Sequence, residues 1–299
     1  PGPFPFRTFE YGHKHTGAEI RTARKAGIVN KYNSRSMVQE MAWAAGESDF
    51  PVEAFLQKKG GEYYDPHIRR EISECSLDEL VERRTHIKSY FARALKADVI
   101  VATLGLSEYW FDEEMGLALS EIPDPYCLRS NPGRFSFCVS EVEDVIGDLN
   151  AVHDIVSRNG NPGCQFIVTT SPVPMGRRFT DQDVIIANMH SKSVLRIASL
   201  AFAQQHDNVD YYPSYEGAML SDPRLVWASD RLHVSAFMVG KLIREFLVRY
   251  GVDVPDDGSD VIVNDEDAVV ALRKELDRQS KRIVELERGS ESSELISAI

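Results

Sequence analysis

The sequence predicts an α/β fold with a doubly wound parallel sheet, and two observations support this prediction. Short, nearly continuous apolar runs occur at residues 98–104 and 164–170, which is typical of buried parallel strands. Helical patterns lie between these runs and before a shorter run at 209–212, so strands and helices alternate along the chain. In such a sheet the loops beyond the carboxyl ends of the strands carry the functional groups.

The helices are predicted from apolar spacing and from capping residues. A first helical pattern begins at Ser34, with Ser36 as the expected N-cap. A second pattern runs from about Ser76 to Lys96, and Glu79 completes a capping box with Ser76. Further helices are expected at about 140–157, 191–204 and 236–250, with a turn at 160–163.

Composition shifts divide the chain into four expected segments: an N-terminal segment at 1–29, an α/β domain at 30–252, an acidic linker at 253–265 and a helical tail at 266–299. From the Pro-rich start without an initiator Met, we expect residues 1–29 to be the remnant of a longer chain. In the tail, apolar residues recur every three or four positions, which predicts a short coiled coil and a homo-oligomer through residues 266–288. A single amphipathic helix that packs against the domain is the alternative.

The composition is that of a soluble globular protein, with 43% hydrophobic and 27% charged residues in a chain of 299. A formal net charge of −12 argues against nucleic acid as a partner, because no basic run compensates it. Basic residues such as Lys31, Arg83 and Arg84 are scattered, and solvated helix faces explain them. No apolar stretch approaches the roughly 20 residues that span a bilayer, so no membrane span is expected.

The four cysteines, at positions 75, 127, 138 and 164, show no C-x-x-C spacing and no Cys/His pairing of the zinc type. We therefore expect no metal site, and reduced thiols that are mostly buried. The first residues also lack the charged start and apolar core of a signal peptide. Reduced thiols favour a cytoplasmic location.

The candidate catalytic pair is Asp230 and His233. Of the eight histidines, only His233 has an aspartate three positions before it. An aspartate at this spacing can accept a hydrogen bond from one imidazole nitrogen, which leaves the other nitrogen basic and directed at a nucleophile. The alternative is a chance D-x-x-H sequence in which His233 caps a helix.

Polar loops follow the predicted strands. They span residues 105–110 after the first strand, 170–174 after the second and 212–216 after the third. Small and hydroxylic residues at strand ends can bring backbone N–H groups near a developing oxyanion, although each loop alone also fits an ordinary turn. We expect these loops and residues 230–233 to gather at one edge of the sheet.

Six sequence blocks together resemble the GSCFA domain, in that family's order and with its approximate spacing. They are residues 30–33 (NKYN), 103–110 (TLGLSEYW), 169–174 (TTSPVP), 191–196 (SKSVLR), 212–216 (YPSYE) and 230–235 (DRLHVS). The GSCFA domain is itself similar to the SGNH (GDSL-type) hydrolases. This resemblance implies a flavodoxin-like three-layer α/β sandwich and Ser-His-Asp acyl chemistry.

The resemblance also implies roles for individual residues. His233 would be the general base and Asp230 the residue that orients it. Gly105 would supply an oxyanion N–H, and Ser107 stands where those hydrolases carry an asparagine, although a hydroxyl reaches less far than a carboxamide. The expected oxyanion and substrate site is completed by Glu108, Ser171 and Tyr215.

Three other polar residues have ordinary interpretations. His67 is expected in a surface loop, with a place near the site as the alternative. Lys192 and Arg196 lie one helical turn apart and are expected to pair with acids on a solvated face. Contact with an anionic group of a substrate is the alternative for this pair.

The serine nucleophile that the resemblance implies is not identifiable in the sequence. The family is named for a Gly-Ser-Cys-Phe-Ala stretch at the end of its first strand, and no such stretch occurs here. The nearest lookalike, at residues 46–49, follows a predicted helix instead of a strand. Three interpretations stay open: the first strand and its serine lie upstream, the lineage lost its nucleophile, or the strand comes from another chain.

We therefore expect an esterase or acyltransferase that acts on an acyl ester, in particular an acetyl ester, of a small molecule or glycan. The ester follows from the Asp-His pair and the resemblance, and the glycan from that family's association with surface polysaccharides. No cofactor is needed for such chemistry. The alternatives are an inactive module that binds a glycan or a protein, and a structural module whose tail drives oligomerisation.

Overall fold

A computed structural model of the chain describes residues 29–68, 76–175, 179, 181–228 and 230–252. The expected linker, the helical tail with its self-association through 266–288, and nearly all of the N-terminal segment lie outside the described residues. The chain divides into two compact units after Met238. Every candidate site residue belongs to the first unit.

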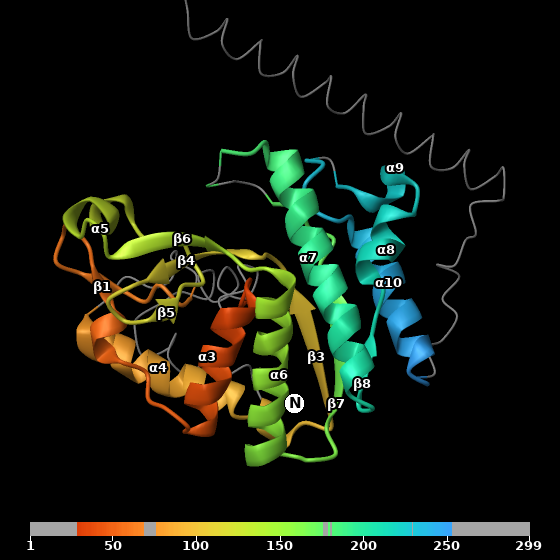
Figure 1. Cartoon of the computed structure of the whole chain (residues 1–299), viewed down its shortest axis with the longest axis horizontal. Helices are drawn as coiled ribbons and strands as arrows, with labels where there is room; N and C mark the ends of the chain where they lie inside the picture. Colours follow the sequence, from red (N-terminus) through yellow and green to blue (C-terminus); the bar gives the residue numbers. More distant parts are fainter. Residues whose placement is uncertain (1–28, 69–75, 176–178, 180, 229, 253–299) are drawn as a thin grey trace, which may run out of the picture. The chain divides into compact units, whose positions relative to one another are not determined.

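A three-stranded parallel sheet forms the centre of the first unit (Figure 1). Its strands are β3 (Val99–Leu104), β7 (Gln165–Thr170) and β8 (Val209–Tyr211), in the order β3-β7-β8. Both strand pairs are parallel, with Ile100 opposite Phe166 and Phe166 opposite Val209. The three predicted strands and their parallel arrangement are confirmed.

Three helices pack together over this sheet: α3 (Ser34–Ala45), α6 (Val142–Asn159) and α7 (Val184–Gln205). Their apolar side chains join the alternate residues of β3 and β7 in one core, which includes Leu104, Val168, Leu149 and Leu195. The residues of β3 that alternate with these core residues are not buried: Val99 and Val101 are about half exposed, at 50% and 49%. Within the described residues, β3 is therefore an edge strand.

A second, antiparallel sheet was not predicted from the sequence. It pairs β4 (Glu108–Asp112) with β5 (Leu117–Ala118) on one side and with β6 (Phe135–Val139) on the other. The prediction of a polar loop at residues 105–110 is therefore partly wrong, because β4 begins at Glu108. Aromatic residues in β4 and β6, including a Trp110–Phe137 pair, supply the β-propensity that the loop interpretation overlooked. A short hairpin joins β1 (Leu56–Gln57) and β2 (Tyr63–Tyr64).

The helix boundaries follow their capping residues. Helix α4 (Leu77–Phe91) begins with the predicted capping box of Ser76 and Glu79, but it ends before a 3-10 turn at Ala94–Lys96. The prediction of Ser36 as the N-cap of α3 is wrong, because Asn33 accepts the Ser36 N–H at 2.8 Å. Helix α7 starts seven residues earlier than expected, since Asp183 caps it. The other helices within the described residues are α5 (Pro125–Ser130), α8 (Ser214–Met219), α9 (Pro223–Val226), α10 (Ala236–Arg249) and the 3-10 turn Val52–Ala54.

Several basic residues are buried, which corrects their expected place on solvated helix faces. Arg84 is 7% exposed and bonds Asp65 through Nε at 2.5 Å and Glu40 through Nη1 at 3.0 Å. Lys31 is 8% exposed, and its Nζ lies 2.7 Å from Glu40 Oε2. Arg83 is also buried. Two carboxylates and two cations thus satisfy one another inside the protein.

Two glycines at α6 provide a matched test of the packing. A Cβ at Gly160 would lie 2.2 Å from the Leu95 carbonyl oxygen, so we expect Gly160→Ala to destabilise the fold by about 1–3 kcal/mol. A Cβ at Gly147 would meet nothing within 4 Å, so Gly147→Ala should stabilise α6 by about 0.5–1 kcal/mol. Urea unfolding followed by circular dichroism measures both. A Gly160→Ala variant as stable as Gly147→Ala would contradict the close approach to Leu95.

Candidate functional site

Asp230 and His233 form a hydrogen-bonded pair. The His233 Nδ1 lies 2.6 Å from Asp230 Oδ2, and Asp230 Oδ1 accepts the backbone N–H groups of Leu232 and His233, each at 2.9 Å. The side-chain bond from His233 is the main cause that lowers the pKa of Asp230 to about 2. Asp230 therefore stays ionised at neutral pH and fixes the orientation of the imidazole ring.

A tight chain reversal presents this pair. Trp227 and Val234 form an antiparallel bridge, and the Ala228 N–H donates to the His233 carbonyl oxygen at 2.8 Å. Arg231 adopts a left-handed conformation with φ 55°, which turns the chain between Asp230 and His233. His233 does not cap α10, because the Met238 N–H donates to Ser235 Oγ at 3.1 Å. The helix-cap alternative for His233 is therefore wrong.

His233 lines a groove of about 1340 Å³ that runs along β3. Gly105, Glu108 and Ser171 line the same groove, so the structure brings together four of the residues expected at the site. The His233 side chain is 75% exposed, which leaves its ring accessible to a bound molecule. Asp230 contacts the groove through His233.

The turn after β3 is held close to the segment before α3. The Leu106 N–H donates to the Tyr32 carbonyl oxygen at 2.7 Å. A Cβ at position 105 would lie 3.1 Å from the same oxygen, which is why glycine suits this position. Because the N–H groups of Leu106 and Ser107 are already donated, Gly105 is the remaining candidate for an oxyanion donor in this turn.

Ser107 lies beneath the groove and does not line it. Its side chain is 1% exposed, and its Oγ has no hydrogen-bond partner among the described residues. Its backbone N–H donates to Ser191 Oγ at 2.9 Å. The structure therefore places Ser107 where it supports the turn from below.

Glu108 lines the groove, whereas Tyr215 does not. Glu108 opens β4 and is 9% exposed; burial raises the pKa of its carboxyl, and His190 opposes this effect. Tyr215 on α8 does not line the groove, and its hydroxyl lies 3.9 Å from the Met189 Sδ on α7. The structure therefore separates Tyr215 from the other candidate residues.

The remaining sequence blocks also meet at the carboxyl end of the sheet. Thr169 Oγ1 on β7 lies 2.7 Å from the Tyr212 carbonyl oxygen and 2.6 Å from Ser214 Oγ. The Ser214 hydroxyl also donates to the Thr170 carbonyl oxygen at 3.0 Å. The Ser171 N–H donates to the Leu104 carbonyl oxygen at 2.8 Å, which ties the end of β7 to β3. Residues far apart in sequence thus build one edge, as expected.

An aromatic cluster forms one wall of the groove. Trp110, Phe137 and Phe179 lie with ring centroids 5.4–5.7 Å apart, and all three line the groove. The sequence placed Trp110 in a loop expected at the site, residues 105–110, but it did not predict Phe137 there. That residue belongs to β6, and only the antiparallel pairing of β4 with β6 brings it to Trp110.

Lys192 is the site-adjacent residue that the sequence interpretation placed wrongly. It is 1% exposed, and its Nζ donates to the Gly105 carbonyl oxygen at 2.8 Å. Arg196 does pair with an acid, since its Nε lies 2.5 Å from Glu216 Oε1. The two cations therefore have different environments although they lie one helical turn apart.

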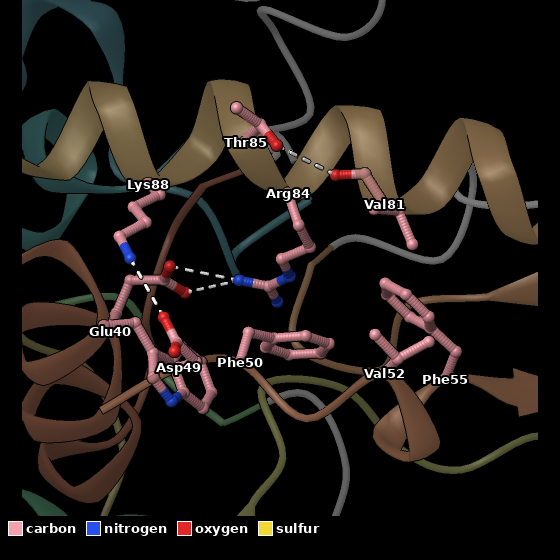
Figure 2. Close-up of a pocket in the computed structure, with 10 residues that line it drawn as sticks. Glu40, Asp49, Phe50, Val52, Phe55, Val81, Arg84, Thr85 and Lys88 are labelled. Carbon is pink, nitrogen blue, oxygen red and sulfur yellow. Dashed lines mark hydrogen bonds and ion pairs between the residues drawn. The ribbon is translucent and has the colours of Figure 1, made fainter. Parts of the chain in front are cut away.

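A second cavity, of about 350 Å³, lies over the buried ion network between α3 and α4 (Figure 2). Figure 2 shows the Arg84 guanidinium between Glu40 and Phe50, whose ring centroid is 4.2 Å from Arg84 Cζ. This cavity shares no lining residue with the groove at His233. His67, which was expected in a surface loop, is also buried, and burial lowers its pKa to about 3.

The chain matches the family model described as the GSCFA family over residues 10–246. It belongs to the GSCFA family. The match extends over every candidate site residue of this GSCFA-family protein, and it confirms the family resemblance drawn from the six blocks. No match was found among curated proteins.

Two further findings describe the GSCFA-family chain. Among the residues that the structure describes, no group of three or more His, Cys, Asp or Glu side chains could hold a metal ion. Within the same residues, no helix has both the length and the apolar character that crossing a membrane requires.

Proposed function

We propose that this GSCFA-family protein is an esterase or acyltransferase of the SGNH type, with a flavodoxin-like arrangement of its α/β domain. The observation that supports the proposal most is the Asp230–His233 pair, joined at 2.6 Å, at the wall of a groove that also contains Gly105. An oriented imidazole beside a backbone donor is the arrangement that acyl transfer through a serine requires.

In the proposed reaction, the free nitrogen of His233 takes the proton of a serine hydroxyl as the serine oxygen attacks the ester carbonyl carbon. The Gly105 N–H stabilises the resulting oxyanion. His233 then returns the proton to the leaving alcohol as the C–O bond breaks. Water or an acceptor hydroxyl removes the acyl group in the second half of the reaction. The substrate proposed is an acyl ester, in particular the acetyl ester of a glycan, and the Trp110 wall suits stacking with a sugar ring.

The alternative is an inactive module that binds a glycan or a protein. One observation favours it: within the described residues, no serine hydroxyl is hydrogen-bonded to His233. Among the described strands, β3 has an unpaired edge beside the groove, where a further strand can pair, and a nucleophile delivered there would complete the site.

Labelling with a fluorophosphonate probe and peptide mapping separate the two functions. We expect one serine to be labelled in the wild-type protein and none in His233→Ala, because the serine loses its base. The assay is run beside hydrolysis of p-nitrophenyl acetate and of an acetylated oligosaccharide. A folded wild-type chain with neither labelling nor hydrolysis would contradict an enzyme whose nucleophile lies within these residues. The binding module, or a serine supplied from outside these residues, would then remain.

A further inference from the structure

Lys192 is a buried cation with a single described partner. Its side chain, 1% exposed, reaches from α7 to the turn after β3, where Nζ donates to the Gly105 carbonyl oxygen at 2.8 Å. No carboxylate forms an ion pair with it in the described part of the chain. A buried ammonium without a counter-ion costs free energy, so its presence beneath a groove points to a role other than stability.

Two neighbouring residues of α7 hold this turn from below. Lys192 binds the Gly105 carbonyl oxygen, and Ser191 Oγ accepts the Ser107 N–H at 2.9 Å. From the other side, the Tyr32 carbonyl oxygen accepts the Leu106 N–H at 2.7 Å. The Gly105–Leu106 peptide is therefore held at both its oxygen and its nitrogen. The Gly105 N–H belongs to the preceding Leu104–Gly105 peptide, whose oxygen accepts the Ser171 N–H at 2.8 Å, so the peptides on both sides of the Gly105 Cα are held.

We propose that Lys192 is a positioning residue of the acyl-transfer site: it holds the Gly105–Leu106 peptide, which directly follows the Gly105 N–H, and adds a positive charge behind the oxyanion position. The catalytic effect of Lys192 rests on the proposed function. The coupling between Lys192 and the Gly105–Leu106 peptide does not. A preorganised donor backed by a fixed charge stabilises a developing oxyanion more than a donor that must reorient.

The protonation state of Lys192 gives the proposal a measurable signature. Burial lowers the pKa of Lys192 to about 8. No titratable group on the surrounding elements contributes to this lowering. These elements carry Glu108, Tyr109 and Asp112 on β4, Glu143, Asp144, Asp148, His153, Asp154 and Arg158 on α6, Asp210 and Tyr211 on β8, and His190 and Arg196 on α7 itself. The charged form thus predominates below about pH 8 and is lost above it. The hydrogen bond from Lys192 Nζ to the Gly105 carbonyl oxygen weakens when the ammonium loses its proton.

Backbone NMR of the Gly105–Leu106 peptide tests this coupling without any activity assay. The chain contains two Gly–Leu pairs, Gly105–Leu106 and Gly116–Leu117. A protein labelled with ¹³C at glycine carbonyls and ¹⁵N at leucine therefore gives two carbonyl–nitrogen correlations. We expect the Gly105–Leu106 signal to titrate with a midpoint of about pH 8 and the Gly116–Leu117 signal to stay constant through that range.

Lys192→Met should abolish that titration, and Lys88→Met, which removes an exposed lysine on α4, should keep it. For ester turnover, we expect Lys192→Met to lower kcat about 10- to 100-fold at pH 7 with KM within about 2-fold of wild type. The wild-type rate should fall above about pH 8, and the variant should lack this decline.

The outcomes separate the two proposals. A wild-type Gly105–Leu106 signal that does not titrate near pH 8 overturns the role of Lys192, and this measurement needs no variant to fold. Titration that persists in Lys192→Met overturns it as well, as does a variant with wild-type kcat. Absence of ester turnover and of probe labelling in the wild-type protein, with the NMR titration present, overturns the proposed function instead.

Discussion

Replacing His233 by alanine is expected to reduce ester turnover by about 10³- to 10⁶-fold, because the serine hydroxyl loses the base that removes its proton. His233 is 75% exposed, so the fold should be unaffected and the free energy of unfolding should stay within about 0.5 kcal/mol of wild type. Steady-state kinetics with p-nitrophenyl acetate, beside urea unfolding of the same preparation, measure both quantities.

The matched control is His86→Ala. His86 on α4 lies 4.0 Å from Glu82 and is outside the groove, so its removal should leave turnover unchanged. Asp230→Asn should lower turnover by about 10⁴-fold, because an amide no longer selects the imidazole tautomer that leaves the outer nitrogen basic. Equal turnover in wild type and His233→Ala would show that any esterase activity of the preparation arises elsewhere.

Replacing Arg84 by methionine is expected to destabilise the protein by about 3–5 kcal/mol, the largest effect on stability that the structure predicts. Arg84 binds Asp65 and Glu40, which are each 1% exposed, so the variant would leave one carboxylate without a cation and the other with Lys31 alone. Methionine fills part of the volume, so the loss reflects the uncompensated charge more than a cavity. Urea unfolding at pH 7 measures the change.

The surface pair of Arg158 and Glu47 is the matched control. Their Nη2–Oε1 distance is 2.9 Å, but the Arg158 side chain is 58% exposed, so Arg158→Met should cost about 0–1 kcal/mol. Similar losses in Arg158→Met and Arg84→Met would contradict the importance assigned to burial of the network.

The pH dependence of the Arg84→Met effect follows from the two carboxylates. Burial acts to raise the pKa of Glu40, but attraction to Lys31 and Arg84 outweighs it and leaves this pKa lowered. The pKa of Asp65 is lowered by Arg84 against burial in the same way. A lowered carboxyl pKa contributes stability above the unfolded value, and that contribution is lost as pH falls through the folded value. We therefore expect the difference in the free energy of unfolding between wild type and Arg84→Met to become smaller below about pH 4.

The sequence by itself predicted the features that depend on neighbours along the chain. The strands at 99–104, 165–170 and 209–211 were recognisable because their apolar runs are short and nearly continuous. The capping box of Ser76 and Glu79 was recognisable because both residues lie within one helical turn. The Asp230–His233 contact spans three residues, so spacing alone indicated it.

Burial of charged side chains was decided only by the tertiary structure. Arg84 binds residues 19 and 44 positions away, and Lys192 binds Gly105 across 87 positions. A local pattern cannot report such partners. A basic residue whose partners are unknown is assigned to solvent, because most basic residues are exposed. The misplacement of Lys31, Arg84 and Lys192 therefore has one cause.

The shape of the candidate site also depended on long-range pairing. The sequence indicated that loops after parallel strands would meet, and Gly105, Ser171 and His233 do line one groove. It did not indicate that β4 would pair with β6, which brings Phe137 to Trp110 as the wall of that groove. Strand pairing between distant segments depends on register and on burial of one face, and neither is determined by the residues of a single strand.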